Sequence, residues 1–580
     1  MQADQTHTNR LGEWIAGRRG RHLREAVTAY LFLAPALLLI FVFGIFPVGF
    51  ALYVSLHKWL IIRDDFVGIG NYVDAIDNLA YFGGFLMGIG GLVGGWLLLR
   101  RLVDTARSHG QRPWLLAIPG ALHAAAALTF IRWLYFQMPE FLDIASKMRG
   151  LDRTRELFQQ LLSEAFHAET VYPHWQQFRL VLVMAVLAGI VASALWRDPR
   201  NASYQAAFAN IWLSLVVGIG LLNFTYAAIA DVYQQAIESG TDPGIWPQLT
   251  MITSGILILV LAWKVWRSAE QQDRPFAFTF RILASLLMMM AGVMLIIEIP
   301  AIVAAGDRDL WDGLRTTIFF SLGIVPVQLT IALFLSVLLF QRLKGSDVFR
   351  IIYFLPYVTP AVASATVFRV MFAERPTAPI NRLIAGLGFE PQLWLRESKG
   401  IFAILASTLK IEDYPQNLIP DWFSPELNDL ITGWLIGPSQ SLLVVIMLSV
   451  WSFVGYNVVI YLAGLGNIPS EMTEAAEIDG ANRWAVFRYI TFPLLSPTTY
   501  FLSLIAVMGT FKAFNTIWVL REAQGPAFAT TRVISVAIFE EFFVKTRYGY
   551  ASAMAFVLFA IILTLTVINN RIQGSRVFYG

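Results

Sequence analysis

The sequence predicts an all-α, polytopic membrane protein with about twelve transmembrane helices. Of its 580 residues, 57% are hydrophobic and 14% are charged, whereas soluble domains average about 45–50% apolar and about 25% charged residues. The mean hydropathy is +0.59, and apolar residues gather in stretches of roughly 20, long enough to cross a hydrocarbon core of about 30 Å. A chain this apolar lacks the polar surface that keeps a soluble protein dispersed.

The composition also excludes several kinds of chemistry. The chain has no Cys and seven His, which rules out disulfides, thiolate catalysis and Cys-based metal sites. Its net charge is +3 and its Lys and Arg residues are scattered between apolar stretches, so a basic nucleic-acid footprint is missing. We therefore expect a chain in a lipid bilayer with no catalytic residues, no metal site and no nucleic-acid partner.

Twelve apolar segments are candidate spans, and the basic residues between them set their direction. The candidate spans are 28–56, 81–99, 114–136, 179–196, 204–230, 247–266, 278–305, 314–341, 349–373, 441–464, 497–520 and 549–570. Basic residues precede the first span and occupy alternate short loops, which predicts that both termini are cytoplasmic. These residues are Arg10, Arg18, Arg19, Arg21, Arg24, Arg100, Arg101, Arg107, Arg112, Arg197, Arg200, Lys264, Arg267, Arg274, Arg342, Lys344 and Arg350.

By this count, two long polar segments lie on the extracytoplasmic side of the membrane. Segment 137–178 contains apolar residues at helical spacing and predicts a helix. Segment 374–440 contains several prolines, which favour loops with short helices over a folded domain.

One predicted cytoplasmic segment, 466–496, reads as a helix, a turn and a second helix. Ser470 is the expected N-cap of the first helix. Gly480 can take the left-handed conformation that ends a helix, Asn482 can cap the next one, and Pro493 is expected to stop it before the following span. Such a compact knob suits docking into a groove of a partner, although a plain interfacial linker fits the same pattern.

This segment also contains a longer motif, "EAAEIDGANRWAVFRYITFP". Around it stand, in order, "YLFLAPALLLIFVFGIFPVGFALYVSL", "VPVQLTIALFLSVLL", "FRIIYFLPYVTPAVASATVFRVMF", "LSVWSFVGYNVVIYLAGLGNIP", "FKAFNTIWVL" and "YGYASAMAFVLF". Together these strings resemble the carbohydrate branch of the binding-protein-dependent ABC importer permeases, which includes the maltose permease MalF. The motif corresponds to the family's EAA loop, whose implied coupling residues here are Glu474, Ala475, Ala476, Asp479, Gly480, Phe487, Ile490 and Pro493.

The resemblance implies a type I ABC permease core of six helices, formed by the first span and the last five. The six spans between them then read as an inserted membrane module. The expected domains are a cytoplasmic tail (1–27), the first core helix with an outside loop (28–80), the inserted module (81–305) and the core permease domain (306–580) with the coupling loop 466–496. The module contains small residues at a spacing that permits close helix packing, Gly84, Gly88, Gly91 and Gly95. We expect it to pack on the core or a partner permease, or else to have a lipid-facing or regulatory role.

In this family the energy comes from a separate ATPase, and no GxxxxGK[ST] phosphate loop occurs in this sequence. The resemblance implies that the EAA loop docks on that ATPase, which carries the ATP and Mg, so that this chain holds no cofactor of its own. It also implies a second, MalG-like permease subunit, two ABC ATPase subunits, an extracytoplasmic sugar-binding protein and a carbohydrate substrate, in a prokaryotic inner membrane.

The family's solute positions map onto Tyr357, Trp451, Tyr456, Phe511, Lys512, Phe514 and Asn515. Aromatic faces stack on sugar rings and neutral polar groups bond hydroxyls, although each aromatic can equally be a packing residue. Pro356 and Pro360 are expected to break a helix at this depth. Lys512 stands mid-span where the family often has Gln, and it can contact a solute or pair with an acid across the permease interface. Arg369, near a helix end, is expected to snorkel or to pair structurally.

We therefore expect a permease subunit of an ATP-driven importer for a carbohydrate, such as a maltose-type oligosaccharide or another glucoside. Lys512 keeps open the import of another polar solute, such as a polyol or a sugar phosphate ester. A stand-alone secondary transporter is the remaining alternative, but it would show two related halves, and the sequence contains no such repeat.

Overall fold

The computed structural model describes residues 18–60, 63–152, 154–196, 198, 200–240, 242–269, 274–341 and 345–574. Regular structure in these ranges is helical apart from one two-stranded hairpin. Ten described helices are long and apolar enough to cross a membrane, and two bent helix pairs raise the number to twelve. The all-α, polytopic membrane fold is therefore confirmed, and every expected span overlaps one of these segments, although 497–520 does so only as far as Phe511. The basic residues Arg10, Arg197, Arg342 and Lys344 lie outside the described ranges.

The chain divides into two compact units, each made of stretches that are distant in sequence. Unit 1 contains Met1–Val67, Thr316–Arg396 and Ser441–Gly580, and unit 2 contains Gly68–Arg315 and Glu397–Gln440. The predicted outside segment 374–440 is thus shared between the units.

Unit 1 begins with a long apolar helix and a small hairpin. These elements are α2 (Arg18–Ile40), the π turn η1 (Phe41–Ile45), α3 (Phe46–Ser55), β1 (His57–Trp59) and β2 (Arg63–Phe66). The strands are antiparallel, with His57 opposite Phe66 and Trp59 opposite Arg63.

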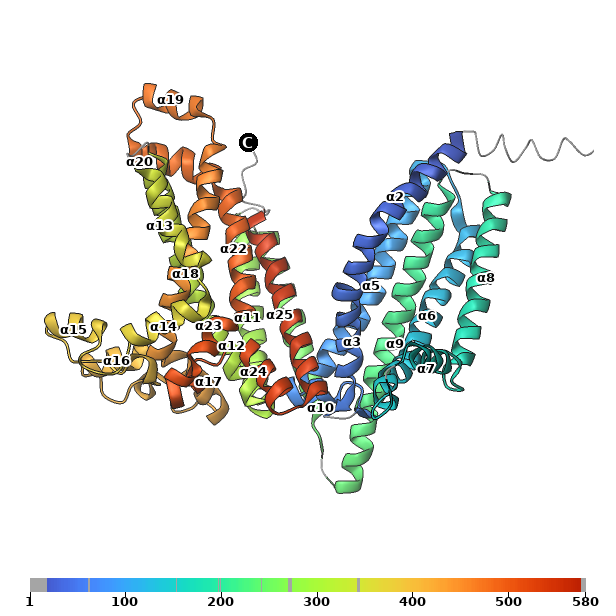
Figure 1. Ribbon diagram of the computed structural model, residues 1–580, viewed down its shortest axis with the longest axis horizontal. Helices are drawn as coiled ribbons and strands as arrows, with labels where there is room; N and C mark the ends of the chain where they lie inside the picture. Colours follow the sequence, from blue (N-terminus) through green and yellow to red (C-terminus); the bar gives the residue numbers. More distant parts are fainter. Residues whose placement is uncertain are drawn as a thin grey trace, which may run out of the picture. The chain divides into compact units, whose positions relative to one another are not determined.

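The rest of unit 1 consists of helices connected by short turns. They are α12 (Arg308–Phe340, in this unit from Thr316), α13 (Ser346–Val358), α14 (Ala361–Met371), α15 (Pro379–Gly386), η3 (Trp394–Arg396), α18 (Gln440–Gly466), α19 (Ser470–Ile478), α20 (Arg483–Val486), η5 (Phe487–Thr491), α21 (Phe492–Leu494), α22 (Ser496–Phe511), α23 (Asn515–Gln524), η6 (Gly525–Thr530), α24 (Ile534–Phe539), η7 (Glu540–Val544) and α25 (Tyr548–Gly574). Figure 1 shows α19 and α20 at one end of this unit and α14, α23 and α24 at the other.

The core of unit 1 is an apolar cluster centred on α18. Leu442, Val444, Val445 and Leu448 are at most 1% exposed there, and they belong to one cluster with residues of α12, α14 and α23. Two polar links join neighbouring helices in this interior. The Thr510 hydroxyl of α22 lies 2.9 Å from the Ser321 hydroxyl of α12, and the backbone N–H of Ile534 donates to Thr317 over 3.0 Å.

Two of the expected spans are broken. Helices α13 and α14 meet at 95° around Thr359 and Pro360, as expected for Pro360, whereas Pro356 lies inside α13 and does not end it. The expected span 497–520 is also interrupted, because α22 ends at Phe511 and α23 starts at Asn515. Lys512 therefore lies at the end of α22. The prediction that it lies in the middle of a span is wrong.

Unit 2 contains α4 of the expected outside loop, the helices of the expected insert and the second half of the outside segment 374–440. They are α4 (Gly70–Ile76), α5 (Leu79–Ser108), η2 (Pro113–Leu116), α6 (Ala117–Lys147), α7 (Arg155–His167), α8 (Tyr172–Leu195), α9 (Asn201–Ser239), α10 (Ile245–Ala269), α11 (Arg274–Ala305), α16 (Ile401–Thr408), η4 (Gln416–Leu418) and α17 (Pro425–Leu435). Helix α7 is the helix predicted within 137–178, and α16 and α17 are short helices predicted within 374–440.

The small-residue stripe of α5 packs on α9 inside unit 2. A Cβ added at Gly91 would lie 2.9 Å from the Cα of Gly218, and one at Gly88 would lie 2.7 Å from the side chain of Leu222. The expectation that this stripe packs on the core or a partner permease is therefore wrong for these positions. The spacing predicts close helix packing but does not identify the opposing helix.

Candidate functional site

The segment 466–496 folds as two helical pieces joined by a glycine turn. Gly480 has a φ of +81°, and the N–H of Ala481 donates to Ala476 over 2.9 Å while that of Gly480 donates to Glu477 over 3.1 Å. This is a Schellman ending, which satisfies carbonyls that the helix end would leave free. Asn482 then caps α20 by accepting from the N–H of Ala485 over 2.8 Å. The turn and the second cap are as the sequence predicts.

Two details of this segment differ from the expectation. Ser470 is the first residue of α19 and Pro469 precedes it as the capping position, without a side-chain cap. Pro493 does not stop the second helical piece, which continues to Leu494 and bends by 60° before α22. Proline fits there because the preceding turn, η5, is π-helical and Pro493 stands in the first turn of α21, where its missing N–H is not required.

The surface of this loop carries both charge and apolar area. Glu474, Ala475, Asp479 and Gly480 are exposed, and the remaining coupling positions are partly buried, namely Ala476, Phe487, Ile490 and Pro493. Large apolar side chains beside them are open, with Ile478 87% exposed and Trp484 68% exposed. A polar loop with such apolar area is suited to contact with another protein.

Among the expected solute positions, Tyr357 of α13 and Tyr456 of α18 come together. Their rings stack with centroids 5.0 Å apart, and Phe453 lies 6.0 Å from Tyr357. Gly455 allows this approach, because a Cβ there would lie 1.8 Å from the carbonyl oxygen of Tyr353. Tyr357 is 42% exposed, so part of its ring is open to a ligand.

Trp451 belongs to a second aromatic contact on α18. Its ring lies 5.8 Å from Phe368 of α14, and it is 43% exposed. Phe368 in turn stacks on Phe372 at 5.5 Å, which meets Trp394 edge-on at 5.2 Å. An aromatic row thus runs from Trp451 to the end of α14.

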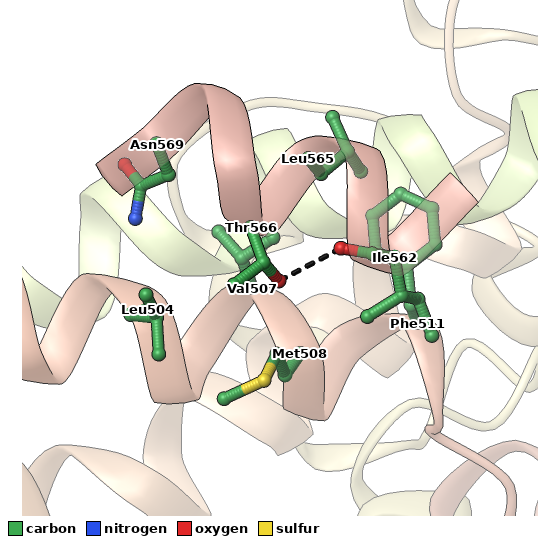
Figure 2. Close-up of a pocket in the computed structure, with 8 residues that line it drawn as sticks. All are labelled: Leu504, Val507, Met508, Phe511, Ile562, Leu565, Thr566 and Asn569. Atoms are coloured by element: carbon green, nitrogen blue, oxygen red, sulfur yellow. Dashed lines mark hydrogen bonds between the residues drawn. The ribbon is translucent and has the colours of Figure 1, made fainter. Parts of the chain in front are cut away.

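The segment 511–515 lies where α22 gives way to α23. Figure 2 shows Phe511 against Ile562 and Leu565 of α25, around a cavity of about 10 Å³, and Phe511 is 4% exposed. Phe514 packs on Trp518 at 5.5 Å and Phe539 at 4.6 Å. Lys512 and Asn515 are exposed.

The break between α22 and α23 is closed from a distant part of the chain. The Ser535 hydroxyl donates to the carbonyl of Ala513, which a continuous helix would have bonded internally. Residues 512–514, between the two helices, include neither proline nor glycine.

Sequence reasoning missed several buried polar groups of the core. Gln328 Oε1, Ser364 Oγ and Asn457 Nδ2 have no hydrogen-bond partner in the described part of the chain. Amides inside apolar spans are a signal for such groups, since each costs free energy unless it is paired. Within the same described part, no cluster of three His, Asp or Glu side chains could hold a metal.

An α-helical, multi-pass protein with broken spans and an exposed helical loop at one end has the architecture of a transport subunit of the membrane. Residues 328–577 match the family described as binding-protein-dependent transport system inner membrane component. The chain belongs to this family of ABC transporter permeases, since relatives 30% identical to it match over 75% of their own length. It is accordingly a multi-pass inner-membrane protein and a transport subunit that is not itself catalytic.

Two relatives support this membership, and one solved structure is reported with them only as a similarity. The arabinooligosaccharides transport system permease protein AraP of Bacillus subtilis (strain 168) is 28% identical over 267 residues, covering 46% of this chain and 71% of AraP. The probable ABC transporter permease protein YesP of the same organism is 30% identical over 275 residues, covering 47% of this chain and 75% of YesP. A crystal structure of a bacterial ABC transporter involved in the import of the acidic polysaccharide alginate matches with a TM-score of 0.37 and 18% identity, over 48% of this chain and 82% of that chain.

Proposed function

We propose that this chain forms the translocation pathway of an ATP-driven oligosaccharide importer and that the loop 466–496 couples it to a separate ATPase. The observation that carries the proposal is the exposed pair of short helices held by Gly480 and Asn482 at one end of unit 1. A rigid projection with open apolar area is suited to transmitting a partner's movement to the spans as a rigid body.

The proposed assembly contains a second, MalG-like permease subunit, two ATPase subunits that bind ATP and Mg, and an extracytoplasmic sugar-binding protein. We place the loop 466–496 and both termini in the cytoplasm. Arg100 in the C-terminal part of α5 and Arg267 in the last turn of α10 support this orientation, because basic residues accumulate on the cytoplasmic side.

We further propose that the solute passes the stacked pair Tyr357 and Tyr456 and the aromatic row at Trp451, with Phe514, Asn515 and Lys512 nearby on the path. The half-open rings of Tyr357 and Trp451 support this assignment, because a fully packed ring offers no face to a sugar. Phe511, packed against α25, would have to move to reach a solute. Lys512 is exposed, which keeps a polyol or phosphate-ester solute as the alternative.

We also propose that residues 81–305 are a membrane module inserted into a permease core, which is formed by residues 28–80 and 306–580. The internal packing of α5 on α9 supports a module that folds around its own contacts.

The proposal is tested at Gly480, where a Cβ would meet no atom within 4 Å, so that a substitution changes the backbone preference alone. Gly480→Val places a β-branched residue in the left-handed region, which costs more than the ~1–2 kcal/mol of an ordinary residue. Gly480→Asn is the matched control, because Asn tolerates this conformation. We expect the Val variant to lose co-purification of the ATPase, or solute-stimulated ATP hydrolysis, while still inserting in the membrane.

The Asn variant should retain both properties. Wild-type uptake and ATPase association in the Val variant would contradict a coupling role for this loop.

A further inference from the structure

A cavity of about 210 Å³ opens in unit 1 where α14 and α23 end. Helices α14 and α23, whose ends line it, lie at the end of unit 1 opposite to α19 and α20 (Figure 1), so the proposed orientation puts the cavity on the extracytoplasmic side. Its charged lining residues are Arg369, Glu374, Arg375, Arg396 and Glu522. A cavity of this size fits part of a sugar ring or an anionic group.

The arginines that line the cavity outnumber the acidic residues available to pair with them. Arg396 is paired with Glu374 at 2.9 Å, and Glu522 is 75% exposed and lies 3.9 Å from Arg521. Within the described ranges, Arg369 and Arg375 form no ion pair. Two guanidinium groups are thus left to face a ligand, and their planar forks match a carboxylate or a phosphate.

The walls of the cavity are fixed by one buried amide. Asn381 is 0% exposed, and its Nδ2 lies 3.1–3.3 Å from the carbonyl oxygens of residues 373–375 and Gln392. Its Oδ1 accepts from the N–H of Gln392 over 3.0 Å and from the indole of Trp394 over 2.7 Å. The backbone that carries Arg375 is therefore held in place before any ligand arrives, which lowers the entropic cost of binding.

The cavity adjoins the aromatic row of the proposed solute path. Phe372 lines it and packs on Trp394, and Phe368, next to Arg369 in the chain, packs on Trp451. One ligand can therefore stack its sugar rings on the aromatic row while an acidic group binds the arginines of the cavity.

We infer that this cavity receives the carboxylate of an acidic saccharide, so that the imported solute is an oligouronate rather than a neutral sugar. The inference rests on the proposed import of an oligosaccharide and adds the charge of the solute. It gives Arg369 a role other than the snorkelling or structural pairing expected from the sequence.

The test uses the complete importer with its binding protein in proteoliposomes. Uptake is measured for di- and trisaccharides of galacturonic, glucuronic and mannuronic acid and for neutral oligosaccharides of the same lengths. Arg369→Gln and Arg375→Gln remove the charge, and Arg382→Gln, at an exposed position of α15 outside the cavity, is the matched control.

We expect the wild-type importer to take up oligouronates in preference to neutral sugars. The half-saturating concentration of the oligouronates should rise with salt, because salt screens the charges. Each cavity variant should raise the half-saturating concentration by about tenfold, because a charge-assisted hydrogen bond is lost. Arg382→Gln should leave it unchanged.

Uptake of neutral sugars alone, with unaltered cavity variants, would overturn the inference and leave the importer assignment intact. A cavity variant that lowers ATP hydrolysis stimulated by the binding protein without solute would assign the arginines to that protein, and the inference would be wrong. If the variants fail to assemble, the wild-type comparison still decides, since equal uptake of both panels at all salt concentrations contradicts it. Absence of uptake for every saccharide would contradict the proposed oligosaccharide import, and this inference with it, and would leave the polyol or phosphate-ester alternative.

Discussion

The close approach of α13 to α18 at Gly455 predicts the effect of one methyl group. In Gly455→Ala the new Cβ would start 1.8 Å from the Tyr353 carbonyl oxygen, whereas ordinary van der Waals contact begins at 3.4 Å. The obstacle is backbone, so no side chain can rotate away. Helix α13 must therefore move by about 1.6 Å, a strain of the kind that costs ~1–3 kcal/mol in a packed interior.

The displacement should reach the proposed solute site. Tyr357 is one helical turn after Tyr353, and Tyr456 follows Gly455, so their 5.0 Å stack opens when the helices separate. An aromatic ring arrangement of this kind contributes ~0.5–1.5 kcal/mol. Because the solute is proposed to stack on these rings, its affinity should fall by up to about tenfold when they separate. The assay compares uptake in proteoliposomes and the thermal midpoint of the purified complex for Gly455→Ala and wild type.

Gly466→Ala is the matched control, because it lies on the same helix and a Cβ there meets no atom within 4 Å. The control should behave as wild type in both measurements. If Gly455→Ala also has wild-type uptake and an unchanged thermal midpoint, the helices are not in the contact described and the reasoning is refuted.

Two further predictions concern the solute path and the topology. Four single substitutions should lower uptake by about two- to tenfold or more while assembly and basal ATP turnover survive: Tyr357→Ala, Trp451→Ala, Tyr456→Ala and Asn515→Ala. Unchanged uptake in all four, or failed assembly in all four, would assign these residues to packing. A topology reporter fused near Gly240 should report an extracytoplasmic position and one near Arg107 a cytoplasmic position, and the opposite reading at either place would contradict the span count.

Local chemistry made much of the fold predictable. The ending of α19 at Gly480 and the cap at Asn482 depend on residues within one turn, and the break at Pro360 depends on a ring that cannot donate a hydrogen bond. The spans depend on the length of apolar runs, which the membrane thickness dictates.

Long-range partners were not predictable in the same way. The break after Lys512 needs the hydroxyl of Ser535, which lies far along the chain and carries no local signal. The stripe of small residues at Gly91 announces a close contact, but only the structure shows that Gly218 is opposite it. Asn381 likewise looks like an ordinary loop amide until its partners surround it.

The division of unit 2 into two stretches has a consequence for the order in which the protein is made. Helix α17 packs on α11, and residues 397–440 are closed on themselves where Ile401 donates to Pro438 and Gln440 to Lys399. The ribosome releases this covering segment only after it has produced α12, α13 and α14 of unit 1. During that interval the surface of α11 that α17 will cover has no packing partner from this segment. Unit 2 can therefore be completed only after these helices of unit 1 have been made, and a nascent chain ending at Arg315 would present the uncovered face of α11 to the insertion machinery.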